Sequence, residues 1–330
     1  MANHKLKLLY ILKQLTDESD NQHPISAEQI LQNLSAHGIP CERKSVYSDI
    51  AVLKDFGYDI CYTKQPCGGY VLATRHFEPT EIQLLCDAVG AANFISPSQS
   101  TQLTEKLVGL LNQNQAEDAK HIAHVQNASK STNEQIYSHI TDLKRAIRDE
   151  KKVTVLYRRR VIGNSNAVEY EEREHTVSPY AMIWSDDHYY LVGNNAKYDN
   201  LMVLRVDRIR KLSVLEEDAR PFSEVSPYTD YFDSADYAHK HFNMFSGTIE
   251  NIELVCKNEL IEPILDRFGE DVHITRFGDD RFILSAEVAV GEGLLAWIMQ
   301  FGAKIQIRNP ETLRSMLTDK IKEIRKAYKI

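Results

Sequence analysis

Apolar residues repeat at helical spacing three times within the first sixty residues, which predicts three short helices. The first covers 5–16, and the second begins at the capping-box pair Ser26 and Gln29 and ends at Gly38. The third apolar stripe follows after a short turn and ends at Gly57. Its inward-facing members are Val46, Ile50 and Leu53.

A hairpin is predicted directly after these helices. Two β-prone segments, 58–63 and 69–72, are joined by a turn over 64–68 that is rich in turn-forming residues. Three helices followed by a hairpin is the order of a winged helix-turn-helix, in which the helix after the tight turn enters the major groove of DNA. The sequence therefore predicts a DNA-binding domain over 1–76.

The predicted DNA-contacting residues lie on the outward side of the third helix and in the hairpin turn. With the apolar stripe turned inward, Lys44, Tyr47 and Ser48 face outward, and Arg43 at the helix start can reach a phosphate or a guanine edge. The full candidate set is Arg43, Lys44, Ser45, Tyr47, Ser48 and Lys64. An ordinary helical domain with a solvated charged face is the alternative, because residues 1–75 carry 8 basic and 8 acidic side chains.

The rest of the chain divides into four further segments. Helical patterns interrupted by a polar stretch at 112–133 predict a helical connector over 77–150. Several short strands over 151–216 predict a small β-barrel. Residues 216–236 hold one basic and seven acidic side chains, which predicts a linker over 217–248. Alternating strands and helices over 249–330 predict a small α+β module.

Cationic and aromatic residues gather in the predicted barrel. Residues 140–215 contain 14 basic and 11 acidic side chains, within a chain whose net charge is -8. The guanidinium of arginine can form two parallel hydrogen bonds to a phosphate or carboxylate, and the ring of tyrosine can stack on a base. These residues therefore suit an anionic ligand. The candidates are Tyr157, His188, Tyr190, Arg205 and Arg208. The alternative is a set of surface arginines paired with nearby acids such as Asp207, Glu172 and Glu174, in which Asp207 or an acid across the barrel is the partner of Arg208.

Several short motifs occur in a family-specific order. They are RKSVYSDI at 43–50, GGY at 68–70, PY at 179–180, YYL at 189–191, RVDRI at 205–209 and FG, NP and Leu313 near the C-terminus. With them the sequence resembles, over nearly its whole length, the bacterial WYL-domain transcriptional regulators that have a DeoR-like winged helix. Two positions depart from the family pattern: Tyr189 replaces the name-giving tryptophan, and Ser48 stands where relatives often have arginine.

The resemblance implies an α+β chain with an N-terminal winged helix-turn-helix, an Sm/SH3-like sensor barrel, a C-terminal extension domain and homodimerisation. It also implies a double-stranded DNA operator and an anionic effector, with a nucleotide or single-stranded nucleic acid as the suspected class. The predicted function is therefore a ligand-modulated transcriptional regulator. The alternative is a scaffold that does not bind DNA and uses the barrel to bind a protein or nucleic-acid partner.

The composition and the absence of several known motifs exclude further classes of protein. No apolar run reaches the length of a membrane span, and the N-terminus has no hydrophobic signal core, so we expect a cytoplasmic chain without a membrane partner. The five cysteines include no CxxC pair, which disfavours a disulfide framework and a zinc ribbon. Without an HExxH, a GxSxG or a glycine-rich phosphate loop, we expect no catalytic site, metal or cofactor.

Overall fold

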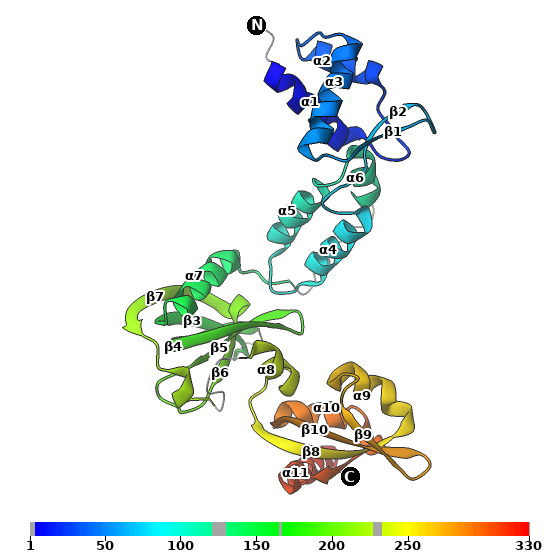
Figure 1. The fold of residues 1–330 in the computed structure, drawn as a ribbon. Helices are drawn as coiled ribbons and strands as arrows, with labels where there is room; N and C mark the ends of the chain where they lie inside the picture. Colours follow the sequence, from blue (N-terminus) through cyan, green and yellow to red (C-terminus); the bar gives the residue numbers. More distant parts are fainter. Residues whose placement is uncertain (1–3, 121–129, 165–166, 227–232, 330) are drawn as a thin grey trace. The chain divides into compact units, whose positions relative to one another are not determined.

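The computed structural model describes residues 4–120, 130–164, 167–226 and 233–329 (Figure 1). The chain forms two compact units, Met1–Thr132 and Asn133–Ile330, called here the first and the second unit. Within the described residues, none of the helices combines the length and the apolar character that crossing a bilayer requires.

The first unit begins with the three helices and the hairpin that periodicity predicted. They are α1 (His4–Glu18), α2 (Ala27–Ala36), α3 (Arg43–Phe56), β1 (Ile60–Thr63) and β2 (Gly69–Leu72). The Ser26 capping box is formed, and Gly57 ends α3 at a φ of 116°, a backbone conformation that favours glycine. The predicted stripe of α3 is buried, together with apolar side chains of α1, α2 and the hairpin.

Three further helices complete the described part of the first unit: α4 (Pro79–Ala91), α5 (Pro97–Val108) and α6 (Gln113–Lys120). Polar contacts join them to the end of α1. The Asn112 amide donates to the Ser19 carbonyl at 2.9 Å and to the Asp20 carboxylate at 3.0 Å. The Arg75 guanidinium donates to the carbonyls of Thr16 and Ser19. The polar stretch expected to interrupt the helical pattern thus includes a helix, α6, while its part at 121–129 lies outside the described residues.

The second unit opens with α7 (Ile136–Arg148) and an antiparallel five-stranded sheet. The strands are β3 (Lys151–Ile162), β4 (Val168–Ser185), β5 (His188–Asn194), β6 (Met202–Arg205) and β7 (Ile209–Asp218). Strand β4 is long enough to pair with β3 along its first part and with β5 along its last part. Buried residues of α7, including Ile136 and Leu143, pack against β3, β4 and β7.

The expected closed barrel is not formed in this sheet. Its strand order is β6-β5-β4-β3-β7, so no ladder joins the two edge strands among the described residues. The reason lies in the short β6, after which the 3₁₀ turn η1 (Val206–Arg208) leads directly into β7. This turn contacts β5 and β3, and β7 pairs with β3. The connector expected over 77–150 is also divided, since α7 packs on this sheet and the boundary between the units falls after Thr132.

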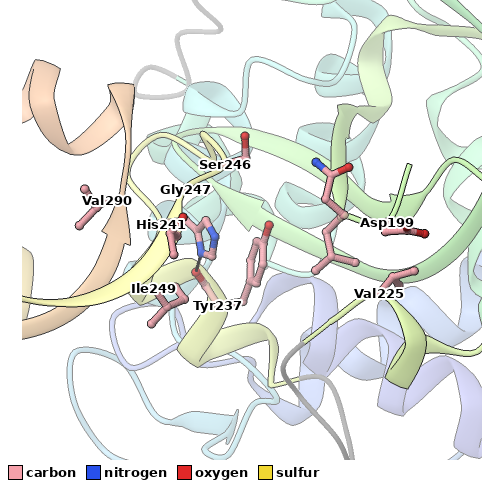
Figure 2. Close-up of a pocket in the computed structure, with 11 residues that line it drawn as sticks. Asp199, Val225, Tyr237, His241, Ser246, Gly247, Ile249 and Val290 are labelled. Atoms are coloured by element: carbon pink, nitrogen blue, oxygen red, sulfur yellow. Dashed lines mark hydrogen bonds between the residues drawn. The ribbon is translucent and has the colours of Figure 1, made fainter. Parts of the chain in front are cut away.

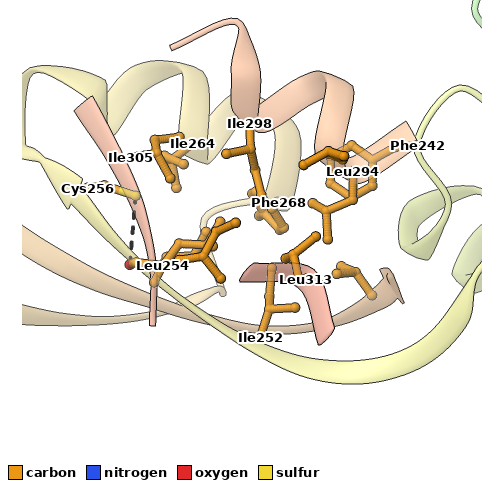
Figure 3. Packing of buried hydrophobic residues seen from close by; sticks show 14 of the residues in the cluster. Phe242, Ile252, Leu254, Cys256, Ile264, Phe268, Leu294, Ile298, Ile305 and Leu313 are labelled. Carbon is orange, nitrogen blue, oxygen red and sulfur yellow. Dashed lines mark hydrogen bonds between the residues drawn. The ribbon is translucent and has the colours of Figure 1, made fainter. Parts of the chain in front are cut away.

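The C-terminal part has the predicted α+β composition. Antiparallel strands in the order β11-β8-β10-β9 form a four-stranded sheet, and its helices share one apolar core (Figure 3). The elements are β8 (Thr248–Lys257), η3 (Asn258–Leu260), α9 (Ile261–Phe268), β9 (His273–Phe277), β10 (Arg281–Val290), α10 (Glu292–Met299), η4 (Gly302–Lys304), β11 (Ile305–Asn309) and α11 (Glu311–Tyr328).

The segment expected to be a linker is partly structured. It contains η2 (Phe222–Glu224) and α8 (Ser234–Lys240), and α8 contacts both β4 and β10. Tyr237 and Met244 are buried against β4 and β5, and Phe242 is buried in the core of the C-terminal sheet. Its acidic charge predicted a linker, but its large apolar side chains pack against the two sheets.

Candidate functional site

The outward face of α3 carries exposed cationic, aromatic and hydroxyl side chains. Arg43, Lys44, Tyr47 and Ser48 are all exposed, as the helical spacing predicted. The guanidinium carbon of Arg43 lies 5.8 Å from the centroid of the Tyr47 ring, within the range of a cation–π contact. This part of α3 therefore presents positive charge beside an aromatic surface.

The hairpin extends this surface with two further tyrosines. The ring centroid of Tyr70 on β2 lies 6.5 Å from that of Tyr47 and 5.2 Å from that of Tyr62 on β1. Burial raises the pKa of Tyr70, the neighbouring tyrosines act in the same direction, and Arg43 acts against them. Lys64 is exposed in the hairpin turn. Sequence reasoning did not name Tyr62, because alternation along 60–63 places it on the same face as the buried Ile60, whereas in the structure it is exposed.

Ser45 differs from the other predicted DNA contacts. Its hydroxyl accepts a hydrogen bond from the ammonium of Lys7, and that ammonium also lies 2.7 Å from the carboxylate of Asp49. The Lys7 side chain is 5% exposed and that of Asp49 is 15% exposed. These contacts hold α1 against α3, so Ser45 is turned toward α1 and helps to orient the helix.

In the second unit, the structure brings four of the five predicted ligand residues together, His188, Tyr190, Arg205 and Arg208. His188 and Tyr190 lie on β5 with ring centroids 6.2 Å apart, and Tyr190 pairs with Arg205 across the β5–β6 ladder. Burial raises the pKa of the Tyr190 hydroxyl, and the positive charges of Arg205 and Arg208 counteract that rise. Tyr157 is on β3, which β4 separates from β5, and its nearest ring contact is His175 at 6.3 Å.

The two predicted arginines have different environments. Arg205 donates to both oxygens of the buried Asp207, at 3.1 and 2.8 Å, and its own side chain is 25% exposed. Asp207 was one of the partners considered for Arg208, whereas in the structure Asp207 pairs with Arg205. Arg208 is exposed at the end of η1. It is therefore the more accessible cation beside Tyr190.

Two of the three arginines of β3 are paired with acids, as the alternative interpretation expected. Arg158 pairs with Glu172 at 2.6 Å and Arg159 pairs with Glu171 at 2.7 Å, across the β3–β4 ladder. Their charges are compensated locally. All five cysteines are free thiols, and no cluster of three or more His, Cys, Asp or Glu side chains suited to a metal ion occurs within the described residues.

Comparison with known proteins identifies two domains. Residues 138–214 match the WYL domain family and residues 250–325 match the WCX domain family, so both domains are present. Neither match indicates a catalytic family. No curated protein matches the chain.

Two solved structures resemble the chain at low identity. Proteasome accessory factor B/C (PafBC) of Arthrobacter aurescens is 15% identical with a TM-score of 0.27, and the match covers 96% of this chain but 46% of that one. The chain thus spans less than half the length of that relative. A CRISPR Cas-related protein is 12% identical with a TM-score of 0.38, over 99% of this chain and 84% of that one.

Proposed function

We propose that this chain is a WYL-type transcriptional regulator that binds a double-stranded DNA operator through a DeoR-like winged helix in its first unit. It acts as a cytoplasmic homodimer, and an anionic ligand at the WYL domain modulates its activity. The observation that carries the proposal is the exposed face of α3, where Arg43 and Lys44 stand beside Tyr47 and next to the hairpin.

The shape and chemistry of α3 support DNA recognition. With 14 residues the helix is about 21 Å long, and the major groove admits a helix. Arginine and lysine at its N-terminal end suit phosphate oxygens and guanine edges. The contact of Lys7 with Asp49 and Ser45 holds the helix against α1, so the exposed side chains project from a fixed support.

The side chains of His188, Tyr190 and Arg208, called here the group on β5 and η1, support the proposal of an anionic ligand. Arg208 offers an exposed guanidinium, while His188 and Tyr190 offer rings for stacking and polar atoms for hydrogen bonds. A nucleotide or a short single strand of nucleic acid combines the negative charge and the flat bases that this group suits. Arg205 contributes by positioning, because its guanidinium is already held by Asp207.

Dimerisation follows from the size of the DNA-binding part and from the first unit's surface. One small module buries about 600–1,000 Å² of protein surface on DNA, so specificity is commonly gained by reading two half-sites with a dimer. Leu84, Leu85 and Leu110 are 65%, 39% and 52% exposed, and we assign this apolar surface to the partner protomer.

The test is selection of bound fragments from genomic DNA, followed by affinity measurements on the selected site. Arg43→Ala and Lys44→Ala should each weaken binding by about 1–3 kcal/mol if they contact base edges, which is roughly 5- to 150-fold. Lys13→Ala is the matched control, because Lys13 is an exposed lysine on α1. Wild-type affinity in both α3 variants, or an equal loss in the control, would refute recognition by α3.

A further inference from the structure

A cavity of about 620 Å³ lies in the second unit, and none of the predicted ligand residues lines it (Figure 2). Its walls come from the loop before β6, from α8, from the start of β8 and from the end of β10. Its volume is within the range of small-molecule sites in proteins. The lining residues are Asp199, Asn200, Leu201, Val225, Tyr237, His241, Ser246, Gly247, Thr248, Ile249 and Val290.

One polar side chain in this cavity has a defined tautomer. His241 is 7% exposed, and its Nδ1 lies 2.8 Å from the carbonyl oxygen of Tyr237. Because a carbonyl only accepts, Nδ1 carries the hydrogen, and a neutral ring keeps Nε2 as an acceptor. Burial lowers the pKa of His241, which favours this neutral form. No described residue donates a hydrogen bond to Nε2.

The position of the imidazole is fixed by its neighbours. The His241 and Tyr237 rings stack with centroids 3.8 Å apart and planes 19° apart. The backbone carbonyl of His241 accepts a hydrogen bond from Arg267 at 3.0 Å. The Nε2 acceptor is thus held in place before a ligand binds, which reduces the entropic cost of binding.

The charges around the cavity disfavour an anion. No lysine or arginine is among the described residues that line it. The one charged lining residue, Asp199, is 87% exposed and pairs with Arg220 at 2.9 Å. Leu201, Val225 and Ile249 contribute apolar wall, while Ser246 and Thr248 contribute hydroxyls.

We propose that this cavity binds an uncharged small molecule with an apolar body and an N–H or O–H group that donates to Nε2 of His241. The molecule differs in charge from the proposed anionic effector and occupies a separate site, so this proposal does not depend on the proposed function. Since the cavity lies between the WYL sheet and the WCX sheet, a bound molecule would contact both domains.

The experiment is ligand-detected NMR on the full chain with matched pairs of compounds, followed by calorimetric titration of any binder. The probes are adenosine, nicotinamide and indole, with AMP, nicotinate and indole-3-carboxylate as their anionic counterparts. We expect at least one uncharged probe to bind more tightly than its anionic counterpart, and we expect Arg208→Ala to leave that binding unchanged.

Two substitutions localise the binding. His241→Asn keeps a donor for the Tyr237 carbonyl and removes the Nε2 acceptor, so it should weaken binding about tenfold. Asn200→Trp adds bulk from an exposed loop position and should abolish binding without lowering the melting temperature. Failure of every uncharged probe, a preference for the anionic counterparts that persists in Arg208→Ala, or binding that neither variant changes would overturn the proposal. None of these results depends on whether the chain binds DNA.

Discussion

Replacing Lys7 tests how the first unit holds its proposed recognition helix. The Lys7 ammonium is nearly inaccessible and contacts both Ser45 and Asp49. Lys7→Ala would leave the Asp49 carboxylate without its cation in a largely buried position. Breaking a buried ion pair by removing one partner costs about 3–5 kcal/mol, and the partial exposure of Asp49 puts this case near the lower end, at about 3 kcal/mol.

The assay is differential scanning calorimetry of the full chain, in which the transition of the first unit should move down by about 10 °C. Lys7→Met combined with Asp49→Leu removes both charges and should restore most of the lost stability, because an apolar pair can replace a buried ion pair at little cost. A shift below about 3 °C for Lys7→Ala would refute the assigned role of Lys7. So would a double variant less stable than the single one.

Three further predictions concern other polar contacts. Arg205→Ala should destabilise the second unit by about 2 kcal/mol, because Asp207 loses two charge-assisted hydrogen bonds; calorimetry that shows no change would contradict this. Burial lowers the pKa values of His139 and His175 below 6.5, so at mildly acidic pH the unfolded chain binds more protons than the folded chain. The melting temperature should therefore fall as the pH decreases below about 6.5, and it should fall less steeply in His139→Gln. Asn112→Ala should cost about 1–2 kcal/mol in the first unit and speed amide exchange at the end of α1, whereas unchanged exchange would exclude a tethering role.

Local patterns predicted the N-terminal elements well. The stripe of Val46, Ile50 and Leu53, the Ser26 cap and the terminating Gly57 depend on interactions within a few residues, and all are present in the structure. The same spacing correctly assigned the exposed face of α3. Information of this kind lies within the segment itself, so the sequence alone is sufficient to read it.

Contacts between distant residues were not predictable in this way. The pairing of Lys7 with Asp49 joins positions far apart in the chain, and nothing in the local pattern distinguishes Lys7 from an exposed lysine. Asp207 pairs with Arg205 because of the path that the backbone takes through η1, and the spacing of residues in the sequence does not define that path. The open order of the five-stranded sheet depended on where the short β6 ends, and boundaries of short strands are weakly encoded locally.

The dependence of DNA affinity on salt concentration is the measurement that bears most directly on recognition by α3. For the wild-type chain on its selected site, the logarithm of the binding constant should fall linearly with the logarithm of the salt concentration. If Arg43 and Lys44 contact phosphates, each alanine substitution should reduce the magnitude of that slope by about one, while Lys13→Ala leaves it unchanged. Unchanged slope and unchanged affinity in both α3 variants would contradict DNA recognition by this helix.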